Sequence, residues 1–133
     1  MEYLCDTNVV GELMRREPDP RLLQWFRTMD RVFISVITVE ETLFGLRRKG
    51  LVHKEAWFRR FLLGAAEVVP VDGETAAWAG ERRGEHAAAG MTRTQADALI
   101  AACAWRRGLV VATRNVRDFE GYGLPVFNPF DQR

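Results

Sequence analysis

The sequence is poor in cysteine, because its 133 residues include only Cys5 and Cys103, and each lies inside an apolar segment. This excludes a disulfide-stapled scaffold and predicts two buried, reduced thiols rather than a bridge or a zinc site. Long apolar runs are also missing, since none approaches the roughly 18 residues that a membrane-spanning helix needs. No basic stretch followed by an apolar one stands at the start, as a secretory signal would require. We therefore expect a cytoplasmic protein with no membrane partner.

Net charge is nearly absent as well, since 19 Lys and Arg residues are balanced by 18 Asp and Glu residues. Whole-chain electrostatics therefore does not indicate a nucleic-acid binder, although clusters such as Arg47, Arg48 and Lys49 would concentrate positive potential locally. Alone, each cluster is better interpreted as a solvated helix face. Repeats, low-complexity stretches and linkers are missing too, so the sequence predicts one domain that spans residues 1–133.

Short runs of β-type composition alternate with longer segments of helical spacing. The predicted strands are residues 2–5, 32–35, 67–71, 109–113 and 125–128. The predicted helices are residues 7–14, 19–30, 38–50, 53–65, 73–90 and 92–108. This alternation is typical of an α/β fold: a mainly parallel sheet of about five strands, flanked by helices on both faces. In such sheets ligands gather at the carboxyl ends of the strands.

Two acids stand where a charge needs an explanation. Asp6 directly follows the first predicted strand, where it would serve as an N-cap for the helix that begins at Thr7. Asp97 shares a helical face with the apolar residues Ile100 and Ala104, which places a carboxylate toward the core. A carboxylate buried alone is costly unless a cation, a metal or hydrogen-bond donors compensate it. We therefore expect a functional role for Asp97, with a satisfied structural acid as the alternative.

Two further segments place polar groups directly after apolar strands. Glu40 and Glu41 begin the helix after residues 32–35, where acids also complement the helix dipole, and we expect one of them to lie in a site. The run that follows residues 109–112 carries Thr113, Arg114, Asn115 and Asp118. Oxygen ligands without a matching set of His or Cys suit Mg²⁺ or Mn²⁺ rather than zinc. Carboxylate-held divalent ions are the usual apparatus for attack of water on a phosphodiester.

Four stretches carry these residues in order: YLCDTNVV from residue 3, ISVITVEETLFGL from residue 34, TQADALIAACA from residue 94 and LVVATRNVRDFEGYGLPVFNP from residue 109. Through them nearly the whole chain resembles the PIN-domain family, specifically the VapC-type toxins of bacterial and archaeal toxin–antitoxin pairs. The resemblance implies that Asp6, Glu41 and Asp97 are catalytic, metal-binding acids. The family's usual Glu-Leu pair is replaced here by Glu41-Thr42, which keeps Glu40 as a minor candidate.

The chain departs from the family pattern at a fourth acid, because Asn115 stands where many relatives have Asp. We expect Asn115 to act with the catalytic acids through its carbonyl oxygen, which brings no charge. The resemblance also indicates residues that support the acids by hydrogen bonding, with capping or turn formation as the alternative: Thr7, Asn8, Ser35 and Thr113. Asp118, three residues beyond Asn115, is grouped with them.

The implied activity is that of a Mg²⁺- or Mn²⁺-dependent endoribonuclease that cleaves cellular RNA, commonly transfer or ribosomal RNA, until a cognate antitoxin blocks it. The resemblance further implies a homodimer and an antitoxin segment laid across the active site. From charge and position we predict that Arg114, or the cluster of Arg47, Arg48 and Lys49, holds the RNA backbone. One set of helix aromatics is expected in the core or a dimer interface, with a groove for the antitoxin as the alternative: Trp25, Phe26, Trp57, Phe58 and Phe61.

Three other functions stay open. The same acids and metal would serve a nuclease for single-stranded DNA. A binding component of a DNA-binding regulatory complex, with little or no catalysis, is favoured by the uncharged Asn115. A nucleotide-binding module is the weakest, because no Gly-rich phosphate loop follows residues 2–5.

Overall fold

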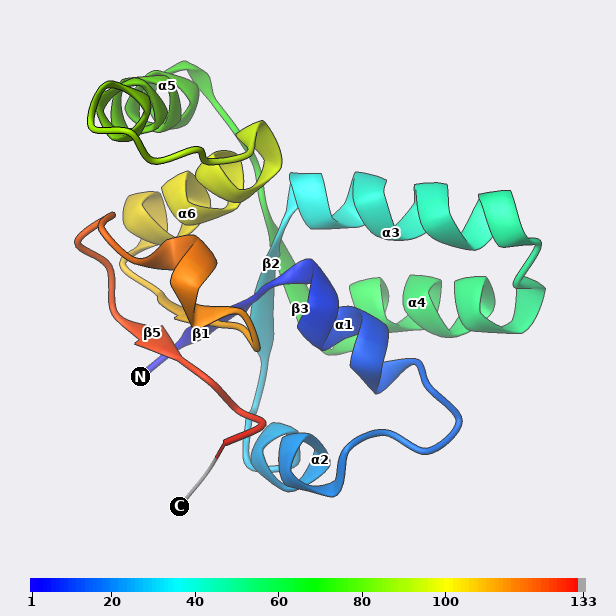
Figure 1. Ribbon diagram of the computed structural model, residues 1–133. Helices are drawn as coiled ribbons and strands as arrows, with labels where there is room; N and C mark the ends of the chain where they lie inside the picture. The colour runs from blue at the N-terminus through cyan, green and yellow to red at the C-terminus, as the bar shows by residue number, and fades with distance from the viewer. Residues whose placement is uncertain (132–133) are drawn as a thin grey trace.

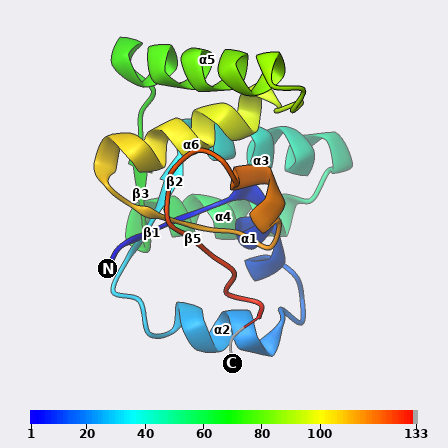
Figure 2. The same cartoon turned by 60° about the vertical axis from the view of Figure 1, so that its left-hand side comes forward.

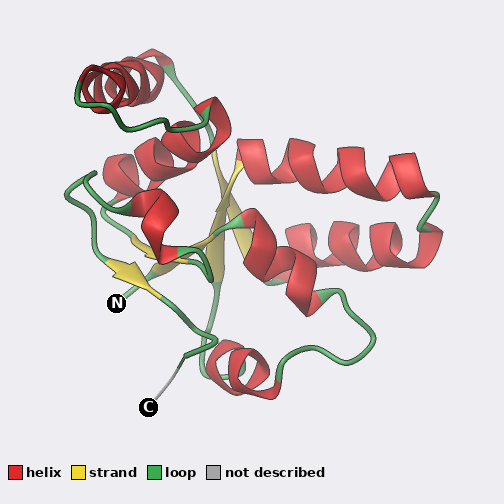
Figure 3. Ribbon diagram, in the orientation of Figure 1, coloured by secondary structure: helices red, strands yellow, loops and turns green. Residues whose placement is uncertain are grey.

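Five parallel strands form one sheet in the order β3-β2-β1-β4-β5 in the computed structural model, which describes residues 1–131 (Figures 1 and 3). The strands are β1 Tyr3–Cys5, β2 Val32–Ser35, β3 Ala66–Val69, β4 Val110–Ala112 and β5 Val126–Phe127. In register, Leu4 is paired with Phe33 on one side and with Val111 on the other. The first strand is thus central, and the strand order reverses beside it, where open α/β sheets bind their ligands. The predicted fold class is confirmed.

Side chains that alternate along the strands divide into two cores, one on each face of the sheet. Leu4, Phe33 and Val111 belong to the core that also holds the apolar residues of α6, whereas Cys5 and Ile34 belong to the opposite core. Both cysteines are free and buried, as predicted, with Cys103 in the first core and Cys5 in the second. Burial raises the pKa of the Cys5 thiol to about 12, so this thiol is an inert core residue.

Four helices cover the second core: α1 Thr7–Leu13, α2 Pro20–Phe26, α3 Val36–Lys49 and α4 Val52–Gly64. α3 begins two residues earlier than predicted, because Ser35 ends β2 and immediately caps the helix by accepting the N–H of Ile37. Gly50 ends α3 at a φ of 66°, and α4 then returns antiparallel beside it, so the α3–α4 hairpin projects from the sheet (Figures 1 and 2).

The aromatic residues of α2 and α4 are core residues, which is the first of the two predictions made for them. Trp25, Phe58 and Phe61 are buried, and Phe26 and Trp57 pack against them at the edge of the same core. Trp25, Phe58 and Phe61 are therefore not available to line a groove for a partner, whereas for the half-buried Phe26 and Trp57 that alternative stays a prediction.

The first core lies beneath α5 Gly73–Ala88 and α6 Gln95–Arg107, which pack side by side (Figures 1 and 2). Thr94 caps α6 and Gly108 ends it at a φ of 66°. A short 3₁₀ helix, η1 Val116–Phe119, follows β4, where only a polar run was expected from the sequence.

No helix within residues 1–131 has the length and apolar character needed to cross a membrane. The prediction of one domain for residues 1–133 stays a prediction, and its last two residues lie outside the described part.

The edge of the sheet at which the parallel strands end is called the carboxyl pole. Very short connections from strand to helix determine which residues lie there. Asp6 alone separates β1 from α1, no residue separates β2 from α3, and Thr113 follows β4 directly. Polar residues after these strands are thereby brought to the same edge, beside the amino ends of α1 and α3. The opposite edge, where the strands begin, is the amino pole.

Candidate metal centre and active site

Asp6 is the buried acid of the carboxyl pole, with 5% of its surface exposed. Its Oδ1 accepts the N–H of Thr7 at 2.6 Å, so it caps α1 as the local interpretation predicts. Its Oδ2 accepts from Nδ2 of Asn8 and from Oγ1 of Thr113, each at 2.9 Å, which ties β1 to the end of β4. Burial raises the pKa of Asp6 to about 6, and the charges of Asp97 and Glu41 act in the same direction.

The two adjacent glutamates of α3 point to different surroundings. Glu41 is half-buried, and its Oε1 accepts the hydroxyl of Thr7 at 2.7 Å. Glu40 is exposed and lines a surface groove with Phe44 and Arg48. Geometry therefore brings Glu41, and not Glu40, to the site of Asp6.

Asp97 lies in the first turn of α6, where its N–H is accepted by Oγ1 of Thr94 at 3.1 Å. It is half-buried, and burial raises the pKa of its carboxyl group, as do the charges of Asp118 and Glu41. Asp118, on η1, is thus close enough to Asp97 to raise its pKa by charge repulsion. It was expected only to support the acids by hydrogen bonding. We call Asp6, Glu41, Asp97 and Asp118 the acidic cluster.

The acidic cluster has no cation of its own. None of its four carboxylates forms an ion pair within 4.0 Å in the part of the chain that the structure describes. The charge of Arg93 lowers the pKa of Asp97, but the effect of burial outweighs it. Four neighbouring acids without a partner charge are a costly arrangement, which a bound cation would relieve.

The expected supporting residues behave differently from one another. Thr7, Asn8 and Thr113 hydrogen-bond to the acids directly. Ser35 does not: it caps α3 and accepts the thiol of Cys103 at 3.2 Å inside the core. Asn115 is exposed, and its backbone N–H donates to Oγ1 of Thr113, which places it one step from Asp6.

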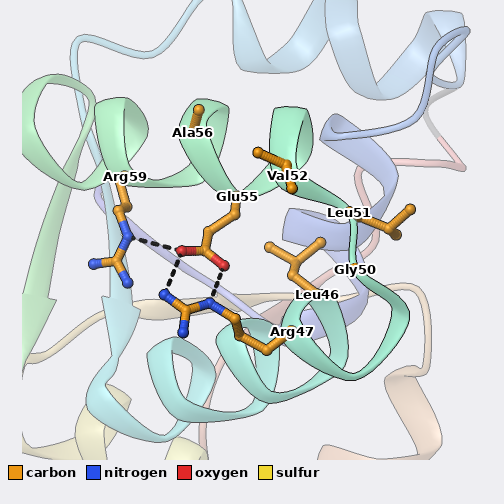
Figure 4. Close-up of a pocket in the computed structure, with 8 residues that line it drawn as sticks. All are labelled: Leu46, Arg47, Gly50, Leu51, Val52, Glu55, Ala56 and Arg59. Atoms are coloured by element: carbon orange, nitrogen blue, oxygen red, sulfur yellow. Dashed lines mark hydrogen bonds and ion pairs between the residues drawn. The ribbon is translucent and has the colours of Figure 1, made fainter.

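The predicted RNA-binding residues lie on different surfaces. Arg114 stands at the carboxyl pole, with its guanidinium 3.9 Å from the ring centre of Phe130 and 3.5 Å from Oε1 of Glu12. Arg47 is paired with Glu55 of α4, which also accepts from Arg59, in a groove between α3 and α4 (Figure 4). Arg48 extends over Phe44 in the groove that contains Glu40. The structure therefore does not bring Arg47 and Arg48 to the acids.

Lys49 has a different position from its two neighbours. It lines a groove of about 230 Å³ between α1 and α3 whose walls also include Thr7, Glu41 and Lys54. Neither lysine forms an ion pair with another described residue. Lys54 could not be predicted from its sequence neighbourhood, because only the turn at Gly50 brings the start of α4 back beside the end of α3.

The acidic cluster fits a divalent cation by its chemistry, since all its donors are oxygens and its charge is uncompensated. Within residues 1–131 no three His, Cys, Asp or Glu side chains form a ready-made ligand group. An ion at this pole would therefore need further ligands from water or from a substrate phosphate, as Mg²⁺ usually takes. The residues fit the predicted ion in donor type, with substrate as a further source of ligands.

Comparison with known proteins decides the family. A family model described as the PIN domain matches residues 3–123. The chain belongs to the PIN-domain family. The VapC ribonuclease Y4jK of Sinorhizobium fredii is 33% identical, over 96% of this PIN-domain chain and 97% of the relative. Toxin FitB of Neisseria gonorrhoeae is 32% identical, over 96% and 97% of the two chains. The tRNA(fMet)-specific endonuclease VapC of Salmonella typhimurium is 28% identical, over 90% and 91%.

Solved PIN-domain structures agree with this assignment. A chain of FitAcB from Neisseria gonorrhoeae superposes with a TM-score of 0.83 at 31% identity, covering 98% of this chain and 99% of that one. A chain of DNA-bound VapBC from Salmonella typhimurium gives 0.80 at 29% identity, covering 97% and 98%. The resemblance to VapC-type PIN domains, first inferred from four sequence stretches, is thereby confirmed.

Proposed function

We propose that this chain is a Mg²⁺- or Mn²⁺-dependent endoribonuclease and the toxin of a toxin–antitoxin pair. The observation that carries the proposal is the acidic cluster: four carboxylates from β1, α3, α6 and η1 at one pole, with no ion-pair partner among the described residues. Uncompensated charge of this kind contributes little to a fold, but it is what a divalent ion requires. Relatives named as a ribonuclease and as a tRNA-specific endonuclease support RNA as the substrate.

We assign Asp6, Glu41 and Asp97 to the metal, with Asp118 and Asn115 as neighbouring oxygen donors. The ion, when bound, makes a coordinated water acidic enough to be a nucleophile and offsets charge on the phosphodiester. Asn8 and Thr113 hold Asp6, and Thr7 holds Glu41, so these carboxylates are oriented before RNA arrives. Asn115 offers an amide to the site without adding a fifth negative charge.

The groove between α1 and α3 is the route that we propose for the RNA backbone. Thr7 and Glu41 form its end at the acidic cluster, and Lys49 and Lys54 add two unpaired ammonium groups to its walls. A phosphate held by these lysines lets the adjacent chain continue toward the acids. Arg114, already at the carboxyl pole, is the other candidate for a phosphate contact.

An antitoxin partner is proposed from the relatives and from exposed apolar surface. The relatives include a chain of FitAcB and a chain of DNA-bound VapBC. Three large apolar side chains of the α3–α4 hairpin are exposed: Phe44 by 61%, Val52 by 73% and Leu63 by 90%. Several exposed apolar side chains on one structural unit favour an interface with another protein. We assign this surface to the antitoxin. The homodimer implied by the resemblance and the cytoplasmic location expected from the composition stay predictions, and light scattering on the purified chain would measure the first.

The test is cleavage of total RNA, with single-stranded DNA of matched sequence, by the purified, partner-free chain. We expect RNA cleavage with Mg²⁺ or Mn²⁺ and none with chelator, and its loss in Asp97→Asn. Glu40→Gln is the matched control, since it removes an equal charge from an exposed position next to the site. Cleavage of the DNA instead would assign the chain to the alternative nuclease. No cleavage of either polymer would favour the partner-binding alternative that Asn115 keeps open.

A further inference from the structure

Arg93 connects two segments that carry acids of the cluster. It lies immediately before Thr94, the cap of α6, and four residues before Asp97. Its guanidinium donates through NH1 to the carbonyl of Arg117 at 2.8 Å and through NH2 to the carbonyl of Glu120. These two carbonyls flank Asp118 in the chain. Arg93 therefore holds the backbone that carries Asp118 against the start of the helix that carries Asp97.

His86 completes this arrangement from the last turn of α5. Arg93 donates its Nε–H to Nδ1 of His86 at 3.1 Å, and Nε2 of His86 lies 3.1 Å from the carbonyl of Gly121. Because guanidinium only donates, Nδ1 must be the acceptor and Nε2 must carry the ring proton. Gly121 has a φ of 86°, a left-handed backbone conformation that favours glycine, and this conformation presents its carbonyl to the ring.

The contacts of Arg93 are unusual for an arginine beside an acidic cluster. Within the described residues it forms no ion pair. Its donors go to two backbone carbonyls, one imidazole and the sulfur of Met91, and its guanidinium lies over the ring of Tyr122. The segment has independent anchors in the core: Phe119 is 1% exposed, and both β4 and β5 are paired in the sheet. The core and the sheet thus hold the segment in place without Arg93. The two hydrogen bonds from the planar guanidinium, which we call its fork, further restrict the position of the backbone at Asp118.

We infer that Arg93 is a positioning residue that acts on the metal centre through Asp118. The inference rests on the proposed function, because it concerns the same site. Its fork binds the backbone on both sides of Asp118 and holds it at the start of the helix that carries Asp97. Arg93→Lys keeps the charge and loses the planar fork, whereas Arg93→Gln loses both.

The first measurement needs no catalysis. Hydrogen exchange of the metal-free protein should be faster in Arg93→Gln at the amides of Asp118 and Glu120, whose bonds lie inside the segment. Arg31→Gln is the matched control: Arg31 also bonds two separate segments, through Glu2 and Glu67, and stacks on a ring, but at the amino pole. Unchanged exchange at both amides in Arg93→Gln would overturn the inference.

The second measurement asks whether Arg93 acts through Asp118. Calorimetric titration with Mn²⁺ should give an affinity about 10-fold weaker in Arg93→Gln than in the wild type, with Arg93→Lys between them. In an Asp118→Asn background the same substitution should add little, because the residue on which it acts is gone. Independent effects that multiply, or an unchanged Mn²⁺ affinity in Arg93→Gln, would overturn it. Both measurements remain decisive if the wild type cleaves no RNA, so failure of the proposed function is seen separately.

Discussion

The two poles of the sheet contain the same kinds of charged residue in opposite arrangements. At the amino pole Arg31 bonds Glu2 and Glu67 at 3.1 and 2.9 Å, and Arg107 bonds Glu67 at 2.6 Å. Both arginines also stack on Phe33, with distances of 4.7 and 5.3 Å to its ring centre. Each of these acids has a cation, and the pKa of Glu67 is lowered by its hydrogen bond with Arg107.

At the carboxyl pole Asp6 and Glu41 accept hydrogen bonds, but no member of the acidic cluster forms an ion pair within residues 1–131, and burial raises the pKa values of Asp6 and Asp97. The presence or absence of an ion-pair partner thus distinguishes acids that stabilise the fold from acids that we propose bind a ligand. Acids that belong to the fold lower its free energy through their partners. Acids of a binding site lower the free energy of unfolding of the empty protein, and a bound ligand restores it.

Asp6→Asn should have the largest effect and should move activity and stability in opposite directions. We expect cleavage to fall by about 10³-fold, because Asp6 is the most buried of the proposed metal ligands. In chelator the variant should be more stable by about 2 kcal/mol, since it no longer carries a charge that burial disfavours. The hydroxyl of Thr113 can turn to accept from the new amide, and the side-chain amide of Asn8, which donates to the same oxygen, must rotate to do so as well. Initial cleavage rates and urea unfolding would measure both effects, and a variant less stable than the wild type in chelator would contradict the comparison.

Glu41→Gln and Glu40→Gln sharpen the same comparison within one helix. Loss of the Glu41 charge should reduce cleavage by about 10²-fold, through a weaker metal site. The Glu40 variant should stay within about 2-fold, because an exposed acid without contact to the cluster contributes little. Mg²⁺ titrations of the cleavage rate would separate a weaker metal affinity from a lower maximal rate. Equal losses in the two variants would show that the assignment of Glu41 is wrong.

Replacing both groove lysines by glutamine should raise the KM for RNA by about 10-fold and reduce its dependence on salt. The maximal rate should change little, because we propose that Lys49 and Lys54 contact the RNA backbone and not the reacting phosphate. Arg31→Gln with Arg107→Gln makes the same change in net charge at the amino pole and should leave KM unaltered. An equal rise in that pair would mean that net charge, and not the groove, attracts RNA.

Several parts of the site could be predicted from local sequence. Asp6 and Thr113 follow apolar strands directly, and parallel strands bring such positions to one edge. Asp97 was visible as a polar residue on an apolar face. Choosing Glu41 over Glu40 needed the family pattern, because both residues stand in the same helical turn.

Other parts depend on contacts between elements, which no local pattern contains. Lys54 reaches the groove only because α4 folds back on α3. Arg93 and His86 meet Glu120 and Gly121 from another segment altogether. Arg47 and Lys49, two residues apart in one basic run, lie on different faces of α3, so a cluster in sequence was not a cluster in space.

The smallest predicted effect concerns Glu67 at the amino pole. Its pKa is lowered from the ordinary 4.5, so its charged form stabilises the fold, fully at neutral pH and progressively less as pH falls below about 4.5. Glu67→Gln should therefore lower the melting temperature slightly at pH 7, and the difference from the wild type should shrink in acid. Because the pair is exposed, high salt should reduce the difference too. Thermal scans of both proteins from pH 7 to pH 3 would measure it. A difference that grows in acid would mean that the charge of Glu67 is a cost to the fold, as at the carboxyl pole, and the contrast between the two poles would fail.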